Sequence, residues 1–255
     1  MEFVKVEGLG NDFVLVEGPR RVMPAEVAAW CDRRRGIGAD GVLVATRLEG
    51  GRVGMEYWNA DGSAAEMCGN GLRCVARYSV ERGWVDRAAF TVETSLGSRK
   101  AEVAADGTVT VQLTDRPVVV GDALEVGGVS ARPADVGNPH AVVFVDDPAA
   151  TEVADLGRRI GGDAVFPEGA NIEFAQVLSP NRIALRVWER GSGETLACGT
   201  GAAAAVAVAH AAGTVETTVT VVLPGGELRV GMDEGSVWIA GPARVVYRGS
   251  WPDSG

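Results

Sequence analysis

The chain has 255 residues, of which 46% are hydrophobic and 23% are charged, and its formal net charge is −10 at pH 7. This length suffices for two domains with hydrophobic cores. The acidic balance argues against a nucleic-acid partner, because a phosphate backbone calls for a basic surface. The longest apolar run, residues 202–209, is far shorter than the roughly 20 residues of a membrane span. Residues 2–6 alternate as a strand does and do not resemble a signal peptide. We therefore expect a cytoplasmic protein that does not bind a membrane.

In the first half, alternating or β-branched apolar runs predict strands at residues 3–6, 13–17, 42–45 and 54–59. A proline opens a short helix over residues 24–31, and a second helix follows Cys68 and stops at Gly83. Residues 89–112 alternate in short runs around a hairpin turn at Asp106-Gly107.

Residues 36–41 match the Gly-X-Gly-X-X-Gly pattern of dinucleotide sites. That pattern binds a nucleotide only where it follows a strand and opens a helix. Here it follows a run of three arginines and precedes a strand. We interpret it as a turn and expect no nucleotide cofactor.

The second half repeats this plan. Strands are predicted at residues 118–126, 141–145, 183–187, 219–222, 228–230 and 237–239. A short helix is predicted over residues 155–160, and a longer one over 202–212 ends at Gly213. The longer helix is apolar around almost its whole circumference, which predicts that it is buried. Each half is therefore expected to be a β-rich sheet around one long helix, an α+β arrangement.

Three pairs of segments recur in the same order, which indicates an internal duplication. Gly10-Asn11-Asp12-Phe13 is echoed 127 positions later by Gly137-Asn138-Pro139-His140. Two Cys-Gly-X-Gly turns follow at an offset of 130, and the turns at residues 95–98 and 223–226 at an offset of 128. We expect two halves, residues 1–116 with Cys68 and 117–243 with Cys198. If the halves face one another, the two cysteines lie on opposite sides of a cleft, where small-molecule sites are common.

Both cysteines stand at the start of a predicted helix. The first amides of a helix have no partner within it and carry the positive end of its dipole, so they bind carboxylates and favour a thiolate. Two thiols on opposite faces of a carbon could invert a stereocentre, since one takes a proton and the other delivers one. A buried structural cysteine is the alternative for either residue alone.

The other cysteines and histidines predict no metal site. No Cys-X-X-Cys pair occurs, and the only histidines are His140 and His210, which does not resemble a zinc site. Cys31 falls at a helix end, Cys74 packs within a helix, and His210 is taken as structural.

Taken together, five segments closely resemble the diaminopimelate epimerase family: 10–13, 36–41, 59–74, 137–140 and 189–201. The resemblance covers nearly the whole chain. It implies two pseudo-symmetric, barrel-like domains around central helices, with the active site in the cleft between them. It also implies cofactor-independent interconversion of LL- and meso-diaminopimelate, in the route to lysine and peptidoglycan, by a homodimer. In the family the C-terminal tail returns to the first domain, so the resemblance places residues 244–255 there, whereas composition leaves this open.

The resemblance assigns Cys68 and Cys198 as the two acid/base thiols, and His140 and Glu189 as residues that tune them. It implies substrate contacts at Asn11, Asn59, Gly69, Asn70, Asn138, Asn171, Glu189, Arg190, Gly199 and Thr200. One departure is Gly41, where some relatives carry a glutamine that contacts the substrate.

From the residues alone, these assignments have alternatives. Arg190 could bind a carboxylate through two parallel hydrogen bonds, or it could form an exposed ion pair with Glu189 that contributes little. Asn59 and Asn70 lie beside turn signals and could be turn residues only. Asn171 could cap a strand edge, and His140 could be a loop histidine whose hydrogen bonds are satisfied.

Three other functions remain open. A proline or hydroxyproline epimerase of the same superfamily is the nearest, but its relatives carry a histidine-bearing version of the turn that here contains Asn70. A thiol redox protein would use the two cysteines as a disulfide. A non-enzymatic amino-acid binding protein would need neither thiol for affinity.

Overall fold

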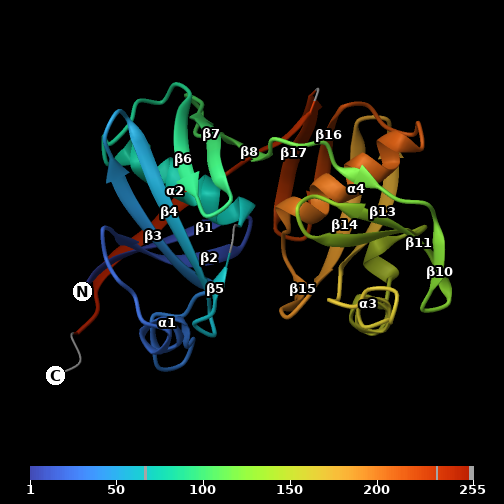
Figure 1. The fold of residues 1–255 in the computed structure, drawn as a ribbon, viewed down its shortest axis with the longest axis horizontal. Helices are drawn as coiled ribbons and strands as arrows, with labels where there is room; N and C mark the ends of the chain where they lie inside the picture. Colours follow the sequence, from blue (N-terminus) through green and yellow to red (C-terminus); the bar gives the residue numbers. More distant parts are fainter. Residues whose placement is uncertain (66–67, 234, 253–255) are drawn as a thin grey trace. The chain divides into compact units, whose positions relative to one another are not determined.

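We describe residues 1–65, 68–233 and 235–252 of a computed structural model of the chain. Glu66 and Met67, which belong to the first cysteine motif, lie outside the described residues. The chain divides into two compact units, one formed by Met1–Val111 with Gly241–Gly255 and the other by Gln112–Ala240. Each unit is a sheet that curves around one long helix (Figure 1).

The sheet of the first unit alternates parallel and antiparallel pairs. Its strands are β1 (Glu2–Gly8), β2 (Asn11–Glu17), β3 (Gly41–Leu48), β4 (Arg52–Asn59), β5 (Ala64–Ala65), β6 (Phe90–Thr94), β7 (Gly97–Val103), β8 (Val109–Thr114) and β19 (Arg244–Ser250). Its helices are α1 (Pro24–Cys31) and α2 (Gly69–Glu81). Strands β1 and β2 are antiparallel, β2 and β3 parallel, β3 and β4 antiparallel, and β4 and β6 parallel. The antiparallel strands β7 and β8 follow.

The second unit repeats this order of pairings. Its strands are β9 (Val119–Val120), β10 (Leu124–Val126), β11 (Val129–Asp135), β12 (Pro139–Phe144), β13 (Asn171–Ser179), β14 (Arg182–Glu189), β15 (Gly193–Thr195), β16 (Thr218–Leu223), β17 (Gly226–Asp233) and β18 (Ser236–Gly241). Its helices are η1 (Pro148–Ala150), α3 (Val153–Gly161) and α4 (Gly199–Ala211). From β11 to β18 the pairings are antiparallel, parallel, antiparallel, parallel, antiparallel and antiparallel. The two-fold repetition predicted from the sequence is confirmed.

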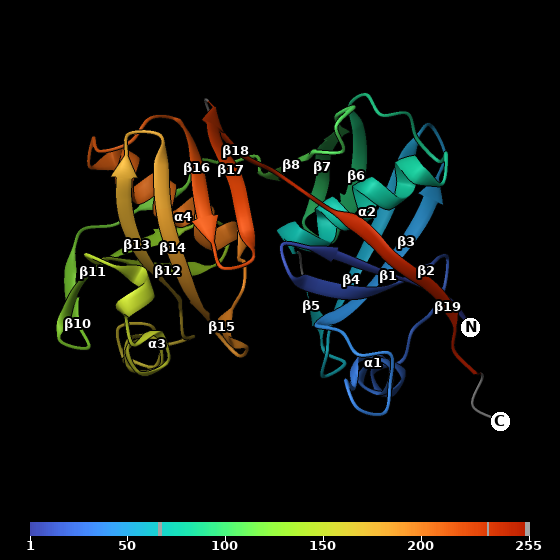
Figure 2. The same cartoon turned by 180° about the vertical axis from the view of Figure 1, so that it is seen from behind.

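In each unit, one edge strand of the sheet comes from the segment that follows the last strand of the other unit in the sequence. Strand β9, which follows β8, pairs antiparallel with β11. Strand β19, which follows β18 and comes from the C-terminal tail, pairs antiparallel with β1 (Figure 2). Among the described strands, the pairings within each unit do not return to their starting strand, so the sheets are open. The predicted α+β fold of two similar β-rich, barrel-like domains around central helices is confirmed, and each sheet is curved but not closed.

The two long helices form the cores around which the sheets wrap. Helix α4 is built from alanine and valine and is buried from Gly201 to Ala209, because small apolar side chains let strands approach on every side. Helix α2 is buried over Gly69–Ala76 and at Tyr78 and Ser79, although it contains a fully buried arginine, Arg73.

Several predicted boundaries differ from the structure. The strand expected over residues 118–126 is two short strands, β9 and β10, that pair with different parts of β11. Strands β11, β13 and β19 were not predicted as strands. Helix α4 begins at Gly199, three residues earlier than expected, since Cys198 occupies the extended position just before it.

Candidate functional site

Cys68 lies in extended conformation immediately before α2 and is half-buried. The first amides of α2 follow it directly, at Gly69 and Asn70. Its thiol donates a hydrogen bond to Asn11 Oδ1, with a sulfur–oxygen distance of 3.6 Å. The first half of the chain therefore places a thiol, a helix N-terminus and an asparagine from β2 in one place.

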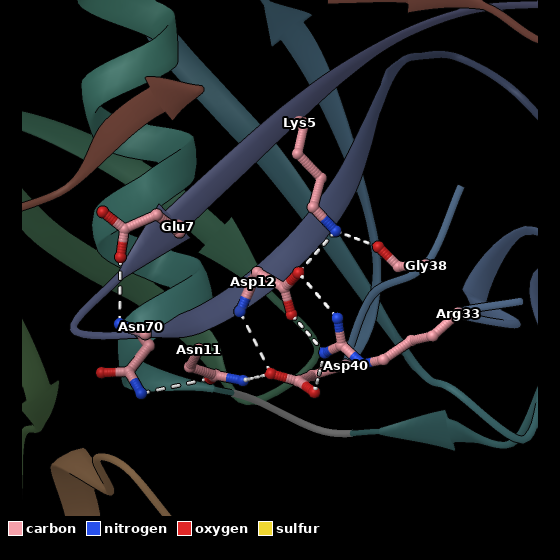
Figure 3. A network of polar contacts seen from close by, with 9 residues as sticks. Lys5, Glu7, Asn11, Asp12, Arg33, Gly38, Asp40 and Asn70 are labelled. Atoms are coloured by element: carbon pink, nitrogen blue, oxygen red, sulfur yellow. Dashed lines mark hydrogen bonds and ion pairs between the residues drawn. The ribbon is translucent and has the colours of Figure 1, made fainter. Parts of the chain in front are cut away.

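The amide of Asn11 has a defined orientation (Figure 3). Asn11 Nδ2 donates to Asp40 Oδ2 at 2.8 Å, and Asn11 Oδ1 accepts from Asn70 Nδ2 at 3.1 Å. A carboxylate can only accept a hydrogen bond, so the NH2 group must face Asp40. The carbonyl oxygen of Asn11 consequently faces Cys68.

Asp40 belongs to a cluster of four charged residues, Lys5, Asp12, Arg33 and Asp40, which we call the Asp12 cluster (Figure 3). Asp12 lies 2.6 Å from Lys5 Nζ and 2.6 Å from Arg33 Nη2, and Arg33 Nη2 also lies 2.6 Å from Asp40. Burial opposes ionisation of Asp12, but hydrogen bonds from Arg33 and Lys5 outweigh it and lower its pKa to about 2. The cluster fixes the carboxylate that orients Asn11.

Arg73 fixes the second amide near Cys68. Its fully buried guanidinium donates to Asn70 Oδ1 at 2.9 Å and to the carbonyl oxygens of Pro242 and Gly69 at 3.4 and 3.5 Å. Burial lowers the pKa of Arg73, yet an arginine keeps its charge in proteins. A positive charge thus lies within the first turn of α2, where it adds to the positive end of the helix dipole.

Asn59 and Gly41 are paired across β3 and β4. Asn59 Nδ2 donates to Ser63 Oγ at 3.0 Å, so this amide group takes part in the turn after β4, as the turn-residue alternative predicted. A side chain at Gly41 has little room, since its Cβ would lie 2.5 Å from the Trp58 carbonyl oxygen and 2.7 Å from the Tyr57 ring. A glutamine at position 41, which the resemblance led us to consider, does not fit on this backbone.

Cys198 is the counterpart of Cys68 and lies immediately before α4, where it is 5% exposed. Its Sγ accepts a hydrogen bond from the Gly201 amide at 3.3 Å and lies 3.4 Å from Thr200 Oγ1. Burial, followed by the nearby charge of Glu189, raises the pKa of the Cys198 thiol well above its ordinary value. Burial therefore favours the neutral form of the Cys198 thiol.

Glu189, at the end of β14, lies beside this thiol. It accepts a hydrogen bond from Thr195 Oγ1 at 2.5 Å, and the nearby Cys198 thiol favours its charged form. Burial raises the pKa of Glu189. Among the described residues, Glu189 and Arg190 do not form the exposed ion pair that was the alternative.

His140 is fully buried on β12, and the loop-histidine alternative does not hold. Its Nδ1 lies 2.7 Å from Glu173 Oε1, and its Nε2 lies 3.0 Å from Asn138 Oδ1. The sequence did not single out Glu173. The signal that could have found it is an acidic residue on an otherwise apolar strand, two positions after Asn171 on β13.

Asn171 and Arg190 lie together where β13 begins and β14 ends. Asn171 Oδ1 accepts from the Arg190 backbone amide at 2.8 Å, and Arg190 Nη1 donates to the Glu168 carbonyl at 2.6 Å. The carbonyl of Asn171 therefore caps a strand end, as one alternative expected. A pocket of about 550 Å³ lies nearby, lined by residues that include Asn138, His140 and Glu168.

Each unit thus brings most of its expected residues together. In the first unit these are Asn11, Cys68, Gly69 and Asn70, and in the second Asn138, His140, Glu189, Cys198, Gly199 and Thr200. In both, a thiol precedes a buried helix whose first amides can hold a carboxylate. Within the part of the chain described, no three His, Cys, Asp or Glu side chains form a group that could hold a metal ion.

The sequence profile of the diaminopimelate epimerase family matches residues 3–120 and 133–246. The chain is 45% identical to a diaminopimelate epimerase of Magnetococcus marinus over 97% of its length and 95% of the relative. It is 41% identical to one from a Synechococcus species, over 98% of both chains.

Solved structures with the same fold are more distant in sequence. A probable proline racemase from Agrobacterium radiobacter superimposes with a TM-score of 0.73 at 17% identity, over 98% of this chain and 92% of that one. A predicted epimerase from Pseudomonas aeruginosa gives a TM-score of 0.73 at 14% identity, over 99% of both chains. These structures show the fold, and the closer sequence relatives show that the chain belongs to the diaminopimelate epimerase family.

Proposed function

We propose that this protein interconverts LL- and meso-diaminopimelate by a two-base mechanism in which Cys68 and Cys198 act on opposite faces of one α-carbon. The observation that carries the proposal is that the same arrangement occurs twice: a cysteine in extended conformation immediately before a long buried helix. Relatives at 41–45% identity over nearly the full length are named for this activity.

The reaction needs a weakly acidic α-proton to be removed. Amides at the start of α2 and α4 can bind the α-carboxylate and stabilise the negative charge that develops as the proton leaves. One cysteine removes the proton as a thiolate while the other, as a thiol, donates one to the opposite face. The two residues exchange roles in the reverse direction, so they titrate as a pair.

The protein's residues support a start from two neutral thiols. Cys68 donates to Asn11 Oδ1, and burial and Glu189 keep Cys198 protonated. Glu189 lies near Cys198, and each group influences the pKa of the other, so Glu189 can accept the thiol proton when the reaction calls for a thiolate. His140 lies behind Asn138 and does not contact the thiol among the described hydrogen bonds.

The remaining amide groups are proposed to recognise the substrate. Asn70, in the first turn of α2, and Asn138, which is bonded to His140, suit the reacting end. Asn59, Asn171 and Arg190 suit the distal end, where an ammonium and a second carboxylate need partners of both kinds. Each already uses one polar group within the fold, so substrate binding would use the other.

Three further features are proposed on the family resemblance alone: assembly as a homodimer, a cytoplasmic location, and a place in lysine and peptidoglycan precursor synthesis. The helices described here include none that is long and apolar enough to span a membrane.

Single substitutions of the two cysteines test the proposal. Cys68→Ser and Cys198→Ser should each lower epimerase turnover by at least about 100-fold, the lower end of what a positioned acid or base contributes. Both variants should still bind diaminopimelate in a calorimetric titration. Cys31→Ala, which removes a buried thiol outside both sites, is the control and should retain turnover. If either serine variant keeps wild-type turnover, the two-thiol mechanism is wrong.

A further inference from the structure

A charged pair lies in the second unit, behind the residues assigned to catalysis. Glu173 Oε1 and His140 Nδ1 are 2.7 Å apart, and both side chains are fully buried. They come from neighbouring parallel strands, β13 and β12. The other ring nitrogen of His140, Nε2, faces Asn138 Oδ1 at 3.0 Å. Glu173, His140 and Asn138 thus form a hydrogen-bonded chain that begins in the interior of the unit and ends at Asn138.

The hydrogen-bond partners define the charge of His140. A carboxylate oxygen and an amide oxygen can only accept, so each must receive a proton from the ring nitrogen that faces it. A neutral imidazole carries one N–H and could supply only one of the two. Acceptors at both ring nitrogens favour an imidazolium at His140, with Glu173 as the compensating negative charge.

Glu173 Oε2 is buried without a hydrogen-bond partner among the described residues, so the charge of Glu173 depends on what surrounds Oε1. Its Oε1 lies 2.7 Å from the position that a Cβ on Gly201 would occupy, so the carboxylate lies against the first turn of α4, where the helix dipole favours an anion. Two other titratable groups lie near, Glu189 on β14 and Cys198 before α4, and burial raises the pKa of both. On β11, Arg132 and Asp135 make their contacts with the backbone at Gly121 and Gly137.

We propose that Glu173 is a positioning residue that acts through His140. Its carboxylate stabilises the His140 imidazolium, whose Nε2–H donates to the Asn138 carbonyl and fixes its orientation. Asn138 then presents its NH2 group to a carboxylate of the substrate, with the positive charge of His140 nearby. This inference rests on the proposed function. It assigns Glu173 no contact with the substrate and no proton transfer.

The charge of His140 can be measured without substrate. The chain has only two histidines, and His210 lies at the exposed end of α4, bonded to the Val215 carbonyl. In protein labelled with 15N-histidine, a His210→Gln variant identifies the His140 signals. At pH 8, where a free imidazole is mostly neutral, both ring nitrogens of His140 should show the shifts of protonated nitrogen. A neutral ring at pH 8 would overturn the proposal, even if the Glu173 variant fails to fold.

Glu173→Gln tests the role of the charge. The variant keeps the shape and one hydrogen-bonding oxygen but removes the negative charge. His140 should then be neutral at pH 8, and KM for diaminopimelate should rise about tenfold, with a smaller change in kcat. A purely structural defect would raise KM without changing the charge of the His140 ring, which the 15N shifts of the variant report directly.

The outcomes separate the two proposals. An imidazolium that persists in Glu173→Gln at pH 8, or a KM unchanged by the loss of charge, would show that Glu173 does not position the site. If the wild-type protein shows no turnover, the proposed function fails. The 15N measurement then still reports on the ion pair. Calorimetric binding of diaminopimelate at pH 6 and 8 replaces the comparison of KM values.

Discussion

Replacing Asp12 by asparagine should remove a pH-dependent part of the stability of the first unit. Asp12 is ion-paired to Lys5 and Arg33, and its pKa in the folded protein is about 2. A fall from the model-compound value of 3.8 to about 2 corresponds to about 2 kcal/mol of folding free energy. Because the Arg33 side chain is 56% exposed, solvent screens part of this interaction, and we expect about 1–2 kcal/mol.

The pH dependence of this stability difference follows from the direction of the pKa shift of Asp12. A carboxylate whose pKa is lowered by folding stabilises the protein above the pKa of the unfolded state and loses this effect as the pH falls towards its folded pKa. The difference in unfolding free energy between wild type and Asp12→Asn should therefore be full at pH 6 and shrink by about 1–2 kcal/mol between pH 4 and pH 2.

Urea denaturation at a series of pH values measures this difference. Asp122→Asn is the matched control, since Asp122 is exposed and forms no ion pair among the described residues, and its difference from wild type should stay near zero throughout. The same Asp12→Asn protein should show a raised KM, because the carboxylate of Asp40 that orients Asn11 is held through Arg33. A stability difference that is independent of pH would refute the electrostatic reasoning.

Three further outcomes are expected. Gly201→Ala should destabilise the protein by about 1–3 kcal/mol despite a gain of about 1 kcal/mol in helix propensity, because the new methyl group meets Glu173 Oε1 at 2.7 Å. In the control Gly71→Ala the methyl group meets the flexible end of Leu43, so the loss of stability should be smaller. Urea unfolding of both variants measures the difference. Alkylation of Cys198 by iodoacetamide, followed by mass spectrometry, should be slow at pH 8 and still rising at pH 10, because the pKa of this thiol is raised well above 9; a plateau below pH 9 would contradict the burial argument. Mild oxidation should abolish epimerase activity and reductant should restore it, whereas full activity in oxidised protein would mean that the two thiols are not the acid/base pair.

The sequence was informative wherever a function or an element depends on a local pattern. The glycine-rich turns before apolar helices located Cys68 and Cys198, and the repeated order of those turns indicated two similar halves. The bounds of α1 were also predicted, from Pro24 at its first position to Cys31 at its last. In each case the signal lies within a few residues of the feature.

Features that depend on distant pairing could not be predicted in this way. The Asp12 cluster joins residues 5, 12, 33 and 40 through the register of β1, β2 and β3. Glu173 and Arg73 are charged residues in the interior, and their partners, His140 and Asn70, are identified only once strands and helices are packed. Strand β11 contains an arginine and a proline, and it is a strand because β9, β10 and β12 pair with it.

The central claim is that two thiols invert one α-carbon of diaminopimelate. Its most direct test is to incubate the purified, reduced protein with LL-diaminopimelate in deuterated water and to analyse the product by chiral separation and mass. The account predicts meso product that carries one deuterium at the inverted α-carbon. With folded and reduced protein, the absence of both exchange and meso product would contradict the account.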